Sequence, residues 1–345
     1  MKHLNTFIGS FIVMCILTAW SNPSPASTLD NLIAEAKKEG SIEFYGPSTL
    51  TNRGAQELID AFNGKYGLKT EINFSPAGSM TRDLGKLIGQ MAAGVTPEWD
   101  LFVASDSHHG RMWLKKLHEP FDYANLGVDS KFITYDSGVV SIVNMFCLPA
   151  YNKKFLPAKD VPKSWEDLLD PKWKGGKLGV SSAVHHLSRL AVGSWGEAKA
   201  TQYVEGISAQ EPILGKLGEM YNRLLMGEIL VSLTLVDTFI KMAEKRGAPL
   251  AFAEGIEPVI AAAYMGGVPK GAEHPNVAHL FLTFLITPEA QKIWDKYHGG
   301  SSALIPGTKA HKFVQGKQVI YMNQDQVKEI NRLTKKYSQI LGFTK

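Results

Sequence analysis

The sequence lacks the features that mark several specialised protein classes. It has only two cysteines among 345 residues, Cys15 and Cys147, so a disulfide framework is excluded. Positive and negative residues nearly cancel, and a net charge of +4 is too small over this length for an electrostatic nucleic-acid-binding protein. Apolar residues make up 44% of the chain, which predicts a globular protein. A length of 345 residues predicts two or three domains. Cys147 lies in an apolar run, 139–148, that indicates burial.

Motifs of common enzyme classes are also missing. The sequence has no Gly-rich phosphate loop, no H-E-x-x-H pattern and no catalytic cysteine context. Its nearest approach to a nucleophile elbow, residues 192–196, lacks the first Gly of G-x-S-x-G and lies between two expected helices. We therefore expect no enzymatic activity and no cofactor, and a hydrolytic enzyme is the least favoured hypothesis.

The N-terminus has the pattern of a signal peptide. A basic start precedes an apolar run over 7–20, which is shorter than the ~20 residues that span a bilayer. Residues 24–26 then supply small side chains at a cleavage site, so we predict a signal peptide over 1–26 and a mature start near Ser27. A lipoprotein alternative would use Cys15, but this residue lies inside the apolar run.

Helix-like and strand-like periods then alternate along the chain. Apolar helical faces precede short apolar strands three times, with the helices at 29–36, 55–66 and 84–91 and the strands at 42–45, 68–74 and 100–104. This order predicts a parallel sheet covered by helices. A second α/β unit follows the long run 139–148, and two further helices are expected at 276–285 and 288–297. The chain is therefore expected to form a second lobe and return to the first.

Small polar residues follow each of the first three predicted strands. Ser48 and Thr49 follow the first strand, Ser79 the second, and Ser105 and Asp106 the third. Carboxyl ends of parallel strands meet at one edge of a sheet, where helix N–H groups point outward, so these residues are expected to share a ligand site. The alternative is that each only caps the helix that follows it.

Three further segments resemble the periplasmic solute-binding proteins of ABC importers, in the bacterial extracellular solute-binding group that includes the ferric-ion binders. They are Pro162-Lys-Ser-Trp-Glu-Asp-Leu-Leu-Asp-Pro-Lys-Trp-Lys-Gly175, Trp195-Gly-Glu-Ala198, and Gly271-Ala-Glu-His-Pro-Asn-Val-Ala278 with Thr287-Pro-Glu-Ala-Gln291. The likeness covers about residues 28–310.

The resemblance implies an α/β, two-lobed periplasmic-binding-protein fold of type II, the Venus-flytrap fold, with two crossing strands. We expect one lobe from 27–138 and 255–345 and the other from 139–254, with 306–345 as a terminal helix packed on a lobe. It also implies a monomer in the periplasm that holds a small-molecule ligand between its lobes and delivers it to an ABC permease in the inner membrane.

The iron site of the ferric members has no counterpart here. Those proteins hold iron with two adjacent tyrosines at the end of a second-lobe strand. In this sequence the strand 229–235 runs into Val236-Asp237-Thr238, and Thr234 and Asp237 stand where the tyrosines would be expected. Because ferric ion favours anionic oxygens, this exchange argues against iron.

Two histidine doublets complete the candidate site. They are His108-His109, after the third strand, and His185-His186, after Ser182 in the second lobe. Neighbours on a helix point about 100° apart, so only one ring of each doublet should engage a ligand. Surface or capping histidines are the alternative interpretation. The predicted ligand-binding set is Ser48, Thr49, Ser79, Ser105, Asp106, His108, Ser182, His185, Thr234 and Asp237.

Two kinds of solute suit this set. Helix N-termini favour negative charge, so the first hypothesis is a small organic anion such as a carboxylate, phosphonate or sulfonate. The second is a metal ion or metal–anion complex held by His108, His185, Asp106 and Asp237. No helical i, i+4 pair of metal ligands accompanies the doublets, so the sequence favours the anion.

Overall fold

A computed structural model describes residues 25–344. The predicted signal peptide, 1–26, lies outside these residues apart from its last two, so it stays a prediction. The chain begins with alternating helices and strands: α1 (Pro25–Glu39), β1 (Ser41–Gly46), α2 (Thr51–Tyr66), β2 (Glu71–Pro76), α3 (Met80–Ala92), β3 (Leu101–Ser105) and α4 (Asp106–Leu114). β1 pairs in parallel with both β2 and β3, which confirms the predicted parallel sheet.

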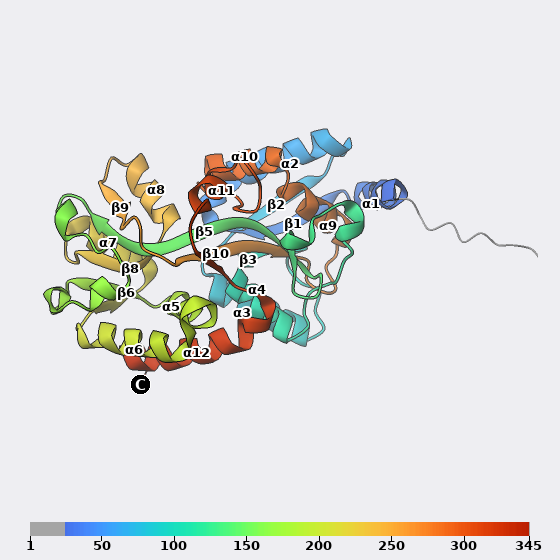
Figure 1. Cartoon of the computed structure of the whole chain (residues 1–345). Coiled ribbons are helices and arrows are strands. Elements are labelled where there is room, and N and C mark those ends of the chain that lie inside the picture. Colours follow the sequence, from blue (N-terminus) through green and yellow to red (C-terminus); the bar gives the residue numbers. More distant parts are fainter. Residues whose placement is uncertain (1–24, 345) are drawn as a thin grey trace, which may run out of the picture.

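Two long strands connect this first group of elements to a second one. β5 (Val139–Asn152) and β10 (Val259–Gly267) pair antiparallel, and β10 also pairs with β3 (Figure 1). Nearly every residue of both strands is buried, because other elements cover both faces. This explains the continuous apolar run at 139–148. We call β5 and β10 the hinge strands.

The second group repeats the α/β pattern. It contains β6 (Leu178–Ser181), α5 (His185–Leu190), α6 (Gly196–Ala209), β7 (Ile213–Gly215), α7 (Leu217–Met226), β8 (Val231–Val236), α8 (Asp237–Lys245) and β9 (Leu250–Phe252). β8 pairs antiparallel with β5 and parallel with β6. The carboxyl ends of β6 and β8 therefore point back toward those of β1, β2 and β3, so the loops after all these strands converge on the hinge.

The C-terminal part returns to the first group and then crosses the hinge again. α9 (Pro275–Leu285) and α10 (Pro288–Tyr297) pack on α1 and α2, whereas α12 (Val327–Leu341) packs on α5 and α6. The segment between them, 299–326, includes α11 (Lys309–Val314) and β11 (Val319–Tyr321), and β11 pairs with β10 (Figure 1). We call 299–326 the strap. The lobe boundaries stay a prediction, and the contacts of α12 favour placing 327–341 with the second lobe.

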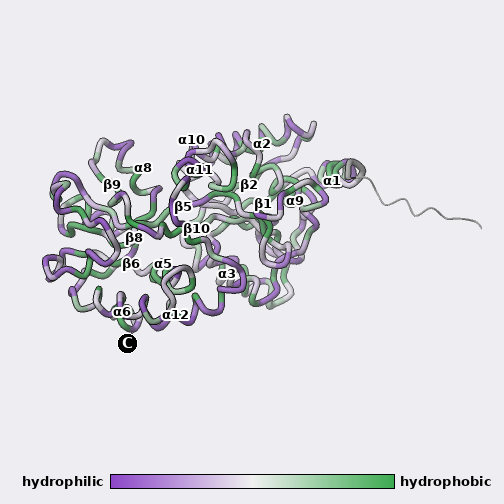
Figure 2. The backbone as a smooth tube through the Cα atoms, viewed as in Figure 1, coloured by the Kyte–Doolittle hydropathy of each residue, from purple (hydrophilic) through white to green (hydrophobic). Residues whose placement is uncertain are grey.

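Apolar side chains form one large core on each side of the hinge. Phe62, Phe281 and Trp294 belong to the first core, and Trp165 and Trp173 belong to the second. Figure 2 shows hydrophobic residues along the central strands and hydrophilic ones on the outer helix turns. The Cys147 thiol is free and buried, as predicted. No helix within 25–344 is long and apolar enough to cross a membrane.

Candidate functional site

The polar residues after β1 and β2 lie at the convergence of the strand ends. Ser48 and Thr49 are exposed in a short turn after β1, and Ser79 is exposed just before α3. The Ser79 side chain makes no capping hydrogen bond, although it stands at the N-cap position. Asp83 fixes this loop instead, because its Oδ2 accepts from the Ser79 N–H at 3.1 Å and from the Tyr45 hydroxyl at 2.9 Å. The capping interpretation is therefore wrong for Ser79.

The residues after β3 form a small polar network. Ser105 Oγ shares a 2.6 Å hydrogen bond with His108 Nδ1, and His108 Nε2 lies 3.4 Å from Thr81 Oγ1 on α3. Ser105 makes no capping bond to α4. His109 is fully buried, where its ring contacts His118 and the Met265 carbonyl oxygen at 3.0 and 2.9 Å. Of the first doublet, only His108 retains exposed surface.

The second doublet divides in the same way. His186 is 4% exposed, whereas His185 at the start of α5 is half-buried and Ser182 is exposed. Burial lowers the pKa of His108 to about 4 and that of His185 to about 3, with smaller effects from nearby arginines. The ion pair between Asp106 of α4 and Arg189 of α5, at 2.6 Å, joins the two helices that carry these histidines. One partly exposed histidine therefore lies on each of two helices that meet across the hinge, and both are neutral at pH 7.

Asp106 is committed to the protein itself. Its Oδ1 accepts from the Arg189 guanidinium at 2.6 Å and from the Ser107 N–H at 2.7 Å, and its Oδ2 accepts from the Ala263 N–H at 3.1 Å. The side chains of Asp106 and Arg189 are 2% and 0% exposed. Asp106 was predicted to contact the solute. Instead, its buried ion pair with Arg189 and its hydrogen bond from the Ala263 N–H join α4, α5 and β10.

Asp237 and Thr234 are also turned into the protein. Thr234 is 2% exposed within β8. Asp237 Oδ1 accepts from the Phe146 N–H at 3.1 Å, and its Oδ2 accepts from Lys241 Nζ at 3.0 Å. Burial raises the Asp237 pKa, and the Lys241 charge opposes that rise. Both side chains are therefore buried in this structure, and Asp237 is paired within the protein.

Sequence reasoning missed a second contact across the hinge. Lys241 donates to the Gly299 carbonyl oxygen, next to His298, which shares a 2.5 Å hydrogen bond with Thr49. The His298 ring packs edge-on against Tyr264 of β10. The i, i+4 spacing of Asp237 and Lys241 was a visible signal for this pair, whereas nothing in the sequence links His298 to Thr49.

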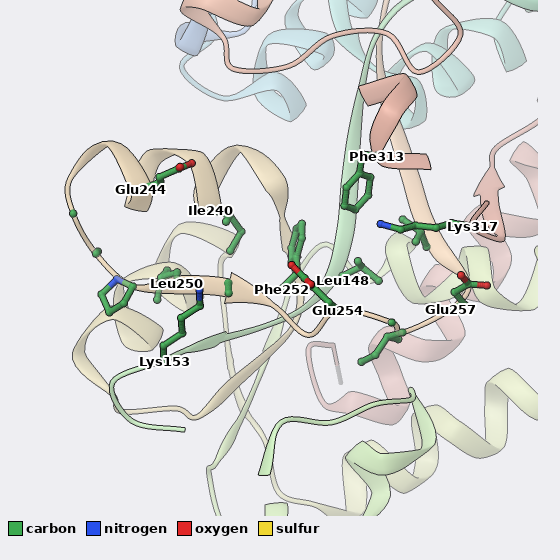
Figure 3. A pocket seen from close by; sticks show the side chains of 17 residues that line it. Leu148, Lys153, Ile240, Glu244, Leu250, Phe252, Glu254, Glu257, Phe313 and Lys317 are labelled. Carbon is green, nitrogen blue, oxygen red and sulfur yellow. The ribbon is translucent and has the colours of Figure 1, made fainter. Parts of the chain in front are cut away.

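A cavity of about 470 Å³ lies elsewhere, between α8, β9 and the strap. Figure 3 shows Ile240, Phe252 and Phe313 around it with Lys153 and Lys317 at its sides. None of the predicted ligand-binding residues lines it. The predicted site is therefore a set of half-buried side chains between strand ends rather than this cavity.

The residues present do not fit a metal. Across 25–344, no three His, Cys, Asp or Glu side chains are grouped closely enough to hold an ion. His108 and His185 have no free carboxylate beside them, because Asp106 pairs with Arg189 and Asp237 pairs with Lys241. Hard cations need anionic oxygens, so the arrangement offers little to ferric ion.

Comparison with known proteins identifies the family. Residues 57–318 match the family described as bacterial extracellular solute-binding protein. The chain belongs to this family. An uncharacterized protein of Haemophilus influenzae is 30% identical over 166 residues, which is 46% of this chain and 46% of that protein. The match therefore spans about half the length of that curated relative.

Solved structures share the fold. Iron-bound HitA from Pseudomonas aeruginosa has a TM-score of 0.68 at 16% identity, over 86% of this chain and 99% of that chain. The ferric binding protein from Campylobacter jejuni has a TM-score of 0.69 at 17% identity, over 87% and 99%. AfuA from Actinobacillus pleuropneumoniae, with fructose-6-phosphate bound, has a TM-score of 0.68 at 19% identity, over 88% and 99%. This likeness confirms the predicted two-lobed, type II periplasmic-binding-protein fold.

Proposed function

We propose that this protein holds a small organic anion between its two lobes, in contact with His108 and His185, and delivers it to an ABC permease. The observation that carries the proposal is that these half-buried rings lie on α4 and α5, two helices from opposite sides of the hinge that the Asp106–Arg189 ion pair joins. A ligand that touches both would stabilise the closed arrangement, because only contacts to both lobes distinguish closed from open.

The charges around the two rings support an anion. Two acids of α3 and α4 are paired within the protein, Asp106 with Arg189 and Asp83 with Arg82 at 3.0 Å. Exposed Ser79 and Ser182 add hydroxyl donors near the N-terminal ends of α3 and α5. An anion placed here would meet hydrogen-bond donors and no unpaired carboxylate from these residues.

The proposal gives a definite sign to the pH dependence of binding. A bound anion favours the charged form of a nearby histidine and so raises its pKa above the free value, which is about 4 for His108. The complex then takes up a proton as pH falls below the bound-state pKa. Affinity should therefore be higher at pH 5.5 than at pH 8, and the gain should continue down to the free-state pKa. A metal ligand would show no such gain over this range and would lose affinity as pH falls toward the free-state pKa.

Titration calorimetry can test this with succinate, phosphonoacetate and ethanesulfonate as probes and uncharged succinamide as the control. We expect His108→Ala and His185→Ala each to weaken anion binding by about tenfold or more, the value of a charge-assisted hydrogen bond. His311→Ala, on the strap, is the matched control and should leave affinity unchanged. Binding that is equal in all variants, or tighter at pH 8, would contradict the proposal.

Export and delivery rest on the family and on the predicted signal peptide. We infer that residues 1–26 are removed and that the mature protein acts as a periplasmic monomer. Intact-mass measurement of the periplasmic fraction should give a chain that starts near Ser27, and light scattering should give the mass of one chain. A protein retained in the membrane with Cys15 acylated would overturn this part alone.

A further inference from the structure

A second pocket lies at the hinge, beneath the strap. It holds about 310 Å³ and is lined by Asp106, by Ser130–Thr134, by Ser141 and Asn144 of β5, by Ala261, Ala263 and Met265 of β10, and by Leu304 and Tyr321–Asn323 of the strap. Neither His108 nor His185 lines this hinge pocket, and of the predicted ligand-binding set only Asp106 does.

Two buried polar side chains open into the hinge pocket. Asn144 is 2% exposed and Ser141 is 7% exposed. Asn144 Oδ1 accepts the Ala303 N–H at 2.7 Å, which fixes the orientation of the amide and directs its Nδ2 away from the strap backbone. Within 25–344, neither Asn144 Nδ2 nor Ser141 Oγ has a hydrogen-bond partner, and neither atom is fully enclosed. Buried polar groups of this kind nearly always have a partner, so these two are available to a bound molecule.

The charged residues that line the hinge pocket already have ion-pair partners. Asp106 pairs with Arg189, and Lys131 pairs with Asp129 at 3.1 Å. The rest of the lining is apolar or uncharged, with Phe132, Met265 and Met322 among the apolar members. A charged ligand would lose its hydration here without gaining a free counter-charge, whereas a neutral one would not. The free donors, an amide N–H and a hydroxyl, suit a carbonyl oxygen.

We propose that the hinge pocket binds a small uncharged carbonyl compound, such as an aliphatic amide, with its oxygen on Ser141 and Asn144 and its carbon chain among the apolar lining residues. Its walls come from the hinge strands, from the strap and from the segment that carries Phe132 of the first core. An occupant of the hinge pocket would therefore contact both the hinge strands and the strap.

The test uses methyl-¹³C-methionine NMR of the mature protein, because the methyl groups of Met265 and Met322 report on the hinge pocket itself. Pentanamide should shift both signals in a saturable way, and pentanoate, its charged counterpart of the same shape, should not. Ser141→Ala should weaken pentanamide binding several-fold. Asn144→Asp keeps the acceptor for Ala303 but removes the donor, and should weaken it at least as much.

The control is Ser338→Ala, a half-buried serine of α12 outside the hinge pocket, which should bind pentanamide as the unaltered protein does. The methionine spectrum of each variant also shows whether it is folded. Equal shifts with pentanamide and pentanoate, an unchanged affinity for pentanamide in both pocket variants, or no shift up to the solubility limit would overturn the proposal. None of these outcomes bears on the anion site, which is read by calorimetry at His108 and His185.

Discussion

Two of the contacts that join the lobes differ in their access to water. Asp106 and Arg189 form an ion pair with both side chains buried, and Arg189 also donates to the Ala261 carbonyl oxygen at 2.7 Å. The second contact runs from Asp237 through Lys241 to Gly299, and the Lys241 side chain is 34% exposed. Charges that separate without water are costly, whereas a lysine at the surface exchanges one partner for another. The first contact therefore behaves as a fixed pivot and the second as one that can open.

The largest effect should come from removing one charge of the pivot. Arg189→Met leaves the Asp106 carboxylate buried without its counter-ion, so we expect a loss of about 3–5 kcal/mol in the free energy of unfolding, measured by urea denaturation. Arg223→Met is the matched control, because it removes an exposed ion pair with Glu228 and should cost less than about 1 kcal/mol. Equal losses of unfolding free energy in the two variants would contradict the predicted difference between a buried and an exposed ion pair.

A smaller effect on the free energy of unfolding is expected from pH, through the titration of His298 at the second contact. Burial, with the Lys241 charge, lowers the pKa of His298 to about 3. Below about pH 6.5 the unfolded chain binds a proton at this residue and the folded chain does not, so stability falls between pH 6.5 and about 3. At pH 5 the loss from His298 alone is about 2 kcal/mol. Urea denaturation at pH 7.5 and pH 5 should show a shallower loss for His298→Gln, and an unchanged slope would contradict the burial of this ring.

The smallest effect is expected at Lys241. Lys241→Met removes the bond to Gly299 and the counter-ion of Asp237, but the lysine position is 34% exposed and water can reach the carboxylate through it, so the free energy of unfolding should fall by only about 1 kcal/mol. Without ligand, the radius of gyration from small-angle scattering should increase, because this contact between the lobes is gone. Lys241→Arg keeps the charge and should keep the smaller radius. A larger stability loss than that of Arg189→Met would reverse the order of the two contacts.

Local patterns predicted most of the fold and part of the site. The alternating apolar periods predicted β1–β3 and their helices, and the uninterrupted apolar run at 139–148 predicted β5. The helix α7 was missed although Leu217, Met220, Tyr221 and Leu224 have helical spacing and the last three are buried. Helix geometry allows only one ring of each doublet to face outward, but that rule alone does not choose His108 over His109 or His185 over His186.

Contacts between distant residues account for what the sequence could not show. Asp106 and Arg189 are 83 residues apart, and Thr49 and His298 are 249 apart. No periodicity relates such positions, since they meet only when the lobes pack on the hinge. A carboxylate after a parallel strand has the same local pattern whether it faces a ligand or a buried arginine, so the role of Asp106 depended on a partner that sequence reasoning did not assign to it.

The strap adds a mechanical constraint to the hinge. A ribbon of two antiparallel strands can twist, bend and splay, which gives the parts that it joins several independent degrees of freedom. Here a third crossing lies alongside, held to β10 by β11 and fixed at its ends by α10 on one lobe and α12 on the other. Three linked crossings oppose twisting and splaying and leave rotation about a single line. A small rotation at the hinge therefore moves the outer edges of the lobes by a larger distance.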